Sequence, residues 1–110
     1  MEKTYNKLVR DNIPNIIKNN GETPIIRILT NEEYKQELEK KLYEEYQEVL
    51  ESSGKDRIEE LADMLEVIKS LAKLENKCLE DIITAANQKN SKRGSFNDKI
   101  FLEKVITNNK

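Results

Sequence analysis

Two pairs of carboxylates lie at matching distances on either side of Gly54. The first pair is Glu45 and Glu48, and the second pair is Glu60 and Asp63. Glu48 and Glu60 are each six residues from the glycine, and the other two are each nine residues away. If the segment around the glycine is the turn of an antiparallel helix hairpin, both pairs lie about 9–14 Å from that turn, at a rise of about 1.5 Å per residue. Converging carboxylates repel one another unless a hard cation lies between them. The spacing therefore predicts a Mg²⁺ site and chemistry on phosphates.

The first helix of this hairpin places one carboxylate inside its apolar stripe. At about 100° per residue, Leu38, Leu42 and Val49 fall on one side of the helix. Glu45 falls inside this stripe, where a leucine is expected, and Glu48 falls at its edge. The pattern predicts that Glu45 is buried.

The second helix repeats this arrangement. Glu60 falls within an apolar arc, and Asp63 borders that arc beside Val67 and Leu74, whereas Glu59 falls on the opposite, polar side. Because an unpaired buried carboxylate is costly, such residues are expected to have a cationic partner. Neither apolar stripe contains a lysine, so a divalent ion, Mg²⁺ or Mn²⁺, is the expected partner. A water-filled polar groove, or burial against the basic residues of another protein, remains the alternative.

Two groups of basic residues are candidates for binding phosphate. Lys7 and Arg10 lie near the start of the chain, and Lys89, Lys92 and Arg93 lie near its end. Arginine can bind phosphate oxygens through two N–H groups at once, and lysine acts as a point charge. Either group alone is also typical of ordinary solvated charge.

The composition predicts one small domain that spans residues 1–110. Hydrophobic and charged residues each make up 36% of the chain. The hydrophobic residues recur at helical spacing, which indicates an ordered protein, but so thin a core favours association with a second copy. The net charge of −2 argues against a stable complex with nucleic acid, which usually requires a strongly basic protein.

Several kinds of chemistry are excluded by residues that the chain lacks. It contains no histidine and a single cysteine, Cys78. This excludes Ser-His-Asp and Cys-His catalysis and an intramolecular disulfide, and it makes a zinc site improbable. No apolar run reaches the length of a membrane span, and the first residues do not resemble a secretion signal, so we expect a cytoplasmic protein without a membrane partner.

The sequence predicts an all-α fold. A capping box at Thr30 and Glu33 marks the start of the first long helix. The chain is expected to be extended or to form a short strand over residues 24–29, to form a basic loop over residues 91–96, and to end in a strand or helix over residues 99–106. The predicted helices run from Asp11 or Asn12 through Ile17, from Thr30 to about Ser52, from about Asp56 to Leu74, and from about Leu79 to Lys89.

Three segments together resemble a known family. The string Glu44-Glu45-x-x-Glu48, followed by Glu60-x-x-Asp63, resembles the signature of the MazG-like, all-α nucleoside triphosphate pyrophosphohydrolases. The opening segment, residues 5–14, and the closing Lys-Arg-Gly-Ser-Phe, residues 92–96, resemble its phosphoribosyl-ATP pyrophosphohydrolase-like branch. The resemblance extends over nearly the whole chain.

This resemblance implies an α-helical homodimer or homotetramer, with a four-helix type of bundle formed on association. The implied reaction is hydrolysis of the bond between the α and β phosphates, which yields a nucleoside monophosphate and pyrophosphate. Glu45, Glu48, Glu60 and Asp63 would hold one or two Mg²⁺ ions, and Glu44 would assist by orienting the attacking water.

The resemblance leaves the substrate open. We expect removal of canonical or modified nucleoside triphosphates from the nucleotide pool, with phosphoribosyl-ATP as the second choice, because a shared fold does not fix the substrate. From another class of function, a non-catalytic helical interaction module with an acidic face is the alternative.

Overall fold

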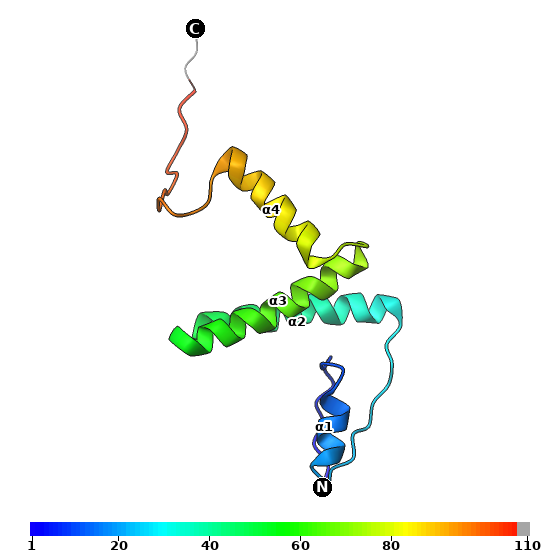
Figure 1. Cartoon of the computed structure of the whole chain (residues 1–110). Coiled ribbons are helices and arrows are strands. Elements are labelled where there is room, and N and C mark those ends of the chain that lie inside the picture. Colours follow the sequence, from blue (N-terminus) through cyan, green and yellow to red (C-terminus); the bar gives the residue numbers. More distant parts are fainter. Residues whose placement is uncertain (108–110) are drawn as a thin grey trace. The chain divides into compact units, whose positions relative to one another are not determined.

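The computed structural model describes residues 1–107, and this part of the chain contains four helices and no strand (Figure 1). The all-α prediction is confirmed. Contacts within the chain define two compact units, Met1–Leu79 and the part from Glu80 onward, and each is described here by itself. The single-domain expectation stays a prediction. The helices are α1 (Ile13–Asn19), α2 (Asn31–Glu51), α3 (Gly54–Leu74) and α4 (Leu79–Arg93).

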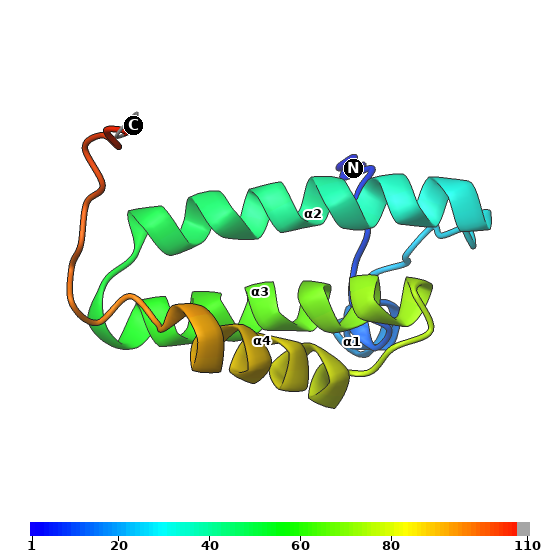
Figure 2. The same ribbon diagram turned by 90° about the horizontal axis from the view of Figure 1, so that it is seen from above.

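Helices α2 and α3 pack against each other as an antiparallel hairpin (Figure 2). Ser52 Oγ donates a hydrogen bond of 2.9 Å to the carbonyl of Val49, and Arg57 Nε donates one of 3.1 Å to the carbonyl of Ser52. Gly54 adopts φ +56°, a conformation that glycine reaches without a Cβ clash. It is the first residue of α3, so this helix starts two residues before the predicted Asp56.

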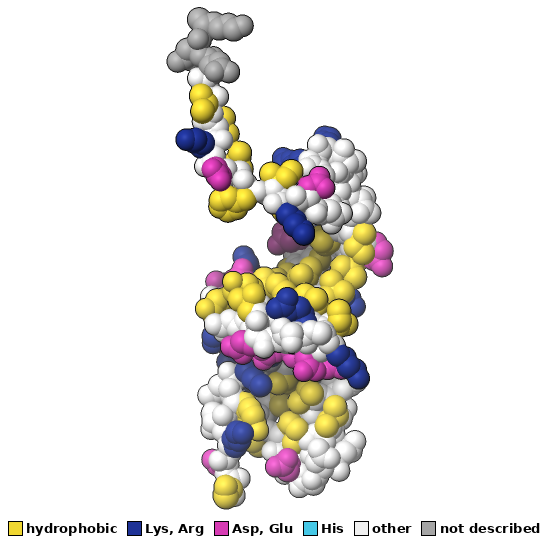
Figure 3. Space-filling view, turned by 90° about the vertical axis from the view of Figure 1, so that its left-hand side faces the viewer, with side chains coloured by type: hydrophobic (Ala, Val, Ile, Leu, Met, Phe, Trp, Pro, Cys, Tyr) yellow, Lys and Arg dark blue, Asp and Glu magenta, His cyan; other side chains and the backbone are white. Residues whose placement is uncertain are grey.

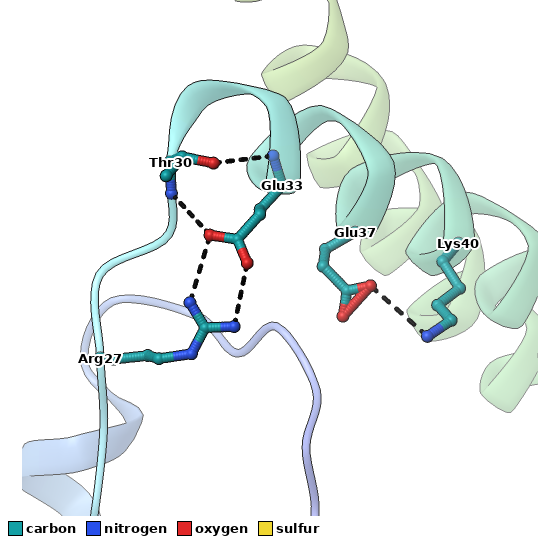
Figure 4. Close-up of polar contacts among 5 residues, drawn as sticks. All are labelled: Arg27, Thr30, Glu33, Glu37 and Lys40. Atoms are coloured by element: carbon teal, nitrogen blue, oxygen red, sulfur yellow. Dashed lines mark hydrogen bonds and ion pairs between the residues drawn. The ribbon is translucent and has the colours of Figure 1, made fainter.

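The start of α2 has the predicted capping box (Figure 4). Thr30 Oγ1 accepts a hydrogen bond of 3.2 Å from the backbone N–H of Glu33, whose carboxylate accepts one of 3.1 Å from the backbone N–H of Thr30. Arg27 also donates two hydrogen bonds to that carboxylate, at 3.1 and 3.2 Å. The hydrogen bond from Arg27 is the main cause that lowers the pKa of Glu33 to about 2. These contacts hold the segment from Arg27 to Thr30 against the first turn of α2.

The short helix α1 forms where the sequence predicts it. Pro14 lies in its first turn, where its missing N–H removes no helical hydrogen bond. After the helix ends at Asn19, Gly21 turns the chain with φ +83°, and its N–H donates to the carbonyl of Lys18. Asn12 precedes the helix and makes no capping hydrogen bond with its side chain.

Helix α4 extends beyond its predicted end at Lys89. The helix continues through Lys92 and Arg93, so these two residues lie in its last turn and the prediction of a loop there is wrong. The segment from Leu79 to Arg93 contains no glycine or proline, and Gly94 follows it with φ +79°. Basic residues are also favourable at a helix C-terminus. Residues 24–29 and 99–106 form neither a strand nor a helix.

Few apolar side chains are buried in the part of the chain described. The buried apolar residues are Leu38, Val67 and Ala72. Among the described helices, α2 is the only one that packs against α3. As a result, Ile58 and Leu65, which the sequence assigns to an apolar arc of α3, are exposed. Within residues 1–107, none of the helices combines the length and the apolar character needed to cross a membrane.

Replacing Thr30 by alanine is expected to destabilise the protein by about 1 kcal/mol, because it removes the hydroxyl that accepts from the N–H of Glu33. Chemical denaturation, followed by the helical signal in far-ultraviolet circular dichroism, measures the change in the free energy of unfolding. Thr30→Ser keeps the hydroxyl and is expected to stay close to the wild type. Equal losses in both variants would contradict the role given to this cap.

Candidate metal centre

The hairpin brings together three of the carboxylates that the sequence singles out. Glu45 from α2 and Glu60 and Asp63 from α3 each offer one oxygen, and these oxygens lie within 4.8 Å of one another. Glu60 and Asp63 share one side of α3 because they are three residues apart. These three residues are called the candidate metal centre below.

Two oxygens of this centre are buried without a partner. The Glu45 side chain is 9% exposed. Glu45 Oε2 and Glu60 Oε2 are inaccessible to solvent and have no hydrogen-bond partner. Such an oxygen loses its hydration without compensation, which is costly for a charged group. Burial of Glu45 agrees with its predicted place in the apolar stripe.

Glu45 and Glu60 hold protons more tightly than isolated carboxylates do. A hydrogen bond with Glu48, followed by burial and the nearby negative charges, raises the pKa of Glu60 to about 7. Burial, followed by the charge of Glu48, raises the pKa of Glu45. Glu48 itself is exposed, at the edge of the stripe as predicted. A cation bound between these residues would replace the proton and remove the repulsion.

Lys41 is a partner of this centre that the sequence analysis missed. Its Nζ lies 3.8 Å from Glu45 Oε1 and 3.6 Å from Glu44 Oε2. Neither apolar stripe was assigned a lysine, but Lys41 nevertheless pairs with the buried Glu45. Lys41 precedes Glu45 by four residues, so the i, i+4 spacing on a helix was the signal that would have identified it. Glu44 pairs with this lysine and is not one of the three residues whose oxygens converge.

Arg10 reaches the centre from the segment before α1. Its Nη2 donates a hydrogen bond of 2.6 Å to Asp63 Oδ1. Figure 3 shows Asp and Glu side chains in a band along the hairpin, next to the N-terminal part of the chain, with hydrophobic side chains gathered above that band. One of the five predicted phosphate-binding residues thus contacts a predicted metal ligand.

The other predicted phosphate-binding residues have different surroundings. Lys7 is exposed, and its Nζ lies 5.7 Å from the centre of the Tyr5 ring. Lys89, Lys92 and Arg93 line one side of α4 together. These three residues belong to the second unit. Their part in a common site with the carboxylates stays a prediction.

The donor set fits a hard divalent cation. Every converging atom is a carboxylate oxygen, the ligand type that Mg²⁺ and Mn²⁺ prefer. Among the buried side-chain atoms of residues 1–107, Glu45 Oε2 and Glu60 Oε2 are the ones without a hydrogen-bond partner. Arg10 and Lys41 lie beside the carboxylates and offset part of their charge.

Comparisons with known proteins give a partial match. No protein-family model matches the chain, and no solved structure matches it. An uncharacterized protein from Mycolicibacterium smegmatis is 44% identical over 50 residues, which cover 46% of this chain and 51% of that protein. The chain therefore matches about half the length of this curated relative. The resemblance to the MazG-like family stays a proposal.

Without a divalent cation, the stability of the protein is expected to fall as the pH rises from about 4.5 to about 7. The folded protein holds the Glu60 proton up to about pH 7, and the unfolded chain releases it near pH 4.5. Because the folded state binds more protons between these two values, the free energy of unfolding decreases as the pH rises from one to the other. Thermal melts in EDTA at about pH 5 and about pH 7.5 measure the effect. Glu60→Gln is expected to reduce the decrease. An equal decrease in this variant would contradict the assignment to Glu60.

Proposed function

We propose that the chain is a Mg²⁺-dependent nucleotide pyrophosphohydrolase of the MazG-like type. It would hydrolyse the α–β phosphate bond of a nucleoside triphosphate or related nucleotide to the monophosphate and pyrophosphate, in nucleotide-pool cleansing. The observation that carries this proposal is the pair of buried, unpartnered oxygens of Glu45 and Glu60 beside Asp63. A hard cation satisfies these oxygens, and the reactions of phosphates commonly need such a cation.

The proposed roles follow from position within the hairpin. Glu45, Glu60 and Asp63 would hold the cation, and Glu48 would complete the ligand set from the exposed edge. When bound, the ion supplies neutralisation of phosphate charge and a lowered pKa of water, so no histidine is required. Glu44 is half-exposed beside the centre, which suits the orientation of the attacking water.

Arg10 is the best-supported phosphate ligand in this proposal. Its guanidinium already lies at the edge of the centre, 2.6 Å from Asp63 Oδ1, where the phosphates of a bound nucleotide would lie. Lys7 is close to Arg10 in the sequence, and Lys89, Lys92 and Arg93 stay candidate phosphate ligands of the second unit.

A homodimer or homotetramer is part of this proposal. Ile58, Leu61 and Leu65 are exposed on α3 at a spacing of i, i+3 and i+7, so they form one apolar stripe along the helix. A stripe of this kind usually packs against another helix. A second copy of the hairpin would cover it and complete a four-helix bundle.

We also propose a cytoplasmic location, with no membrane partner and no stable nucleic-acid complex.

The second candidate function is a non-catalytic helical interaction module. The same exposed stripe on α3 and the acidic side of the hairpin favour it, because both suit an apolar and basic partner. Phosphoribosyl-ATP is the alternative substrate within the enzymatic proposal. The interaction module predicts neither cation binding nor pyrophosphate release.

The enzymatic proposal is tested by incubating the protein with Mg²⁺ and a panel of nucleoside triphosphates and phosphoribosyl-ATP. We expect pyrophosphate release from at least one substrate. Glu45→Gln and Asp63→Asn are expected to lower the rate by about 100-fold or more. Loss of a hydrogen-bond partner of a metal ligand costs up to about 100-fold, and these variants change a ligand itself.

Glu59→Gln is the matched control for this test, because Glu59 is next to Glu60 on α3 but is exposed. Its rate is expected to equal that of the wild type. Full activity in both Glu45→Gln and Asp63→Asn would overturn the site. No release from any substrate would favour the interaction module.

The oligomer is tested by sedimentation velocity of the wild type and of a Leu61→Ser, Leu65→Ser double variant. The wild type is expected to sediment as a dimer or tetramer. The double variant is expected to shift towards the monomer, because it removes apolar area from the stripe that a second copy covers. Glu59→Gln again serves as the control. A monomeric wild type would contradict this part of the proposal.

A further inference from the structure

The contact between Arg10 and Asp63 joins two distant parts of the chain. Arg10 lies in the N-terminal arm, which is defined here as residues 1–12 and precedes α1. Its partner lies 53 residues further along the chain, on α3. Both side chains are largely accessible, with 57% of Arg10 and 44% of Asp63 exposed.

Asp63 cannot serve Arg10 and a divalent cation equally well. It is one of the three residues whose oxygens converge. A guanidinium paired with the same carboxylate neutralises part of the negative charge that attracts the cation, and the two positive groups repel each other. One of the two positive groups must therefore weaken the hold of the other.

Lys41 differs from Arg10 in its location and its exposure to solvent. It lies on α2, four residues before Glu45, so the helix fixes it beside its partner, and 23% of its side chain is exposed. Arg10 lies outside any helix and makes a largely exposed ion pair. Such pairs change an equilibrium constant by a factor of about five or less. Of the two cations, Arg10 is the more exposed one and the one that no helix holds in place.

We propose that Arg10 is a displaceable counter-ion of the candidate metal centre. It occupies Asp63 while no divalent cation is bound, leaves Asp63 when one binds, and is then free to bind the phosphate chain of the substrate. The release of Arg10 detaches the N-terminal arm from α3, and the phosphates hold the arm again. This inference rests on the proposed function, because it requires that the carboxylates bind a cation.

The first test is calorimetric titration of the purified full chain with Mn²⁺ at constant ionic strength. We expect Arg10→Gln to bind Mn²⁺ about two- to fivefold more tightly than the wild type, because the competing guanidinium is gone. Arg27→Gln is the matched control. Arg27 also pairs with a glutamate in an exposed position, with 68% and 40% of the two side chains exposed, but its partner Glu33 is outside the centre (Figure 4). This control is expected to bind Mn²⁺ like the wild type.

The second test follows the arm itself by limited digestion with trypsin, scored by mass spectrometry for cleavage after Lys7. In the wild type, Mn²⁺ is expected to speed this cleavage, and inorganic triphosphate added with Mn²⁺ is expected to slow it again. In Arg10→Gln, cleavage is expected to be fast under all three conditions. Circular dichroism of the variant checks that its helices are intact.

The outcomes separate this inference from the proposed function. If the wild type binds Mn²⁺ but Arg10→Gln binds it equally or more weakly, Arg10 does not compete for Asp63 and the inference is overturned. The same holds if Mn²⁺ leaves cleavage after Lys7 unchanged. In both cases the proposed function stands. If the wild type binds no Mn²⁺, the inference and the proposed function fail together.

Discussion

Repulsion among the carboxylates of Glu45, Glu60 and Asp63 is the constraint on which the rest of the structure depends. The packing of α2 against α3 brings one oxygen of each residue to within 4.8 Å of the others. The protein offsets the repulsion in three partial ways: Glu60 holds a proton up to about pH 7, Lys41 pairs with Glu45, and Arg10 pairs with Asp63. Two buried oxygens nevertheless remain without a partner. A divalent cation would stabilise such a cluster more than these contacts do, because it would offset the remaining charge and bind the two unpartnered oxygens. We base the proposed enzymatic function on this need for a cation.

The same hairpin leaves an apolar side uncovered. Helix α3 presents Ile58, Leu61 and Leu65 to solvent, although a helix with so wide an apolar arc usually packs on more than one side. A hairpin of two helices has one interface, and that interface here is shared between apolar residues and carboxylates. The small core and the acidic centre are therefore two consequences of one geometry. Association with a second copy, as we propose, would stabilise the scaffold that holds the carboxylates together.

The sequence predicted the parts of this structure that depend on local chemistry. The capping box at Thr30 and the burial of Glu45 follow from hydrogen bonding and helical periodicity, and both are confirmed. The contact of Arg10 with Asp63 depends on how the N-terminal arm folds back onto α3, which no local pattern specifies. Lys41 was missed for a different reason, because it lies outside the apolar stripe and reaches Glu45 from one turn earlier on the helix. The end of α4 at Arg93 was missed because solvated polar residues give no clear stop before Gly94.

Binding of a divalent cation at the candidate metal centre can be observed in a crystal structure of the protein grown with Mn²⁺. Anomalous scattering identifies manganese independently of how the surrounding density is interpreted. We expect an anomalous peak in contact with oxygens of Glu45, Glu60 and Asp63, with Arg10 displaced from Asp63. The absence of manganese from the three carboxylates would rule out the metal centre, if a lysine or arginine of another molecule, or ordered water alone, satisfied the oxygens of Glu45 and Glu60.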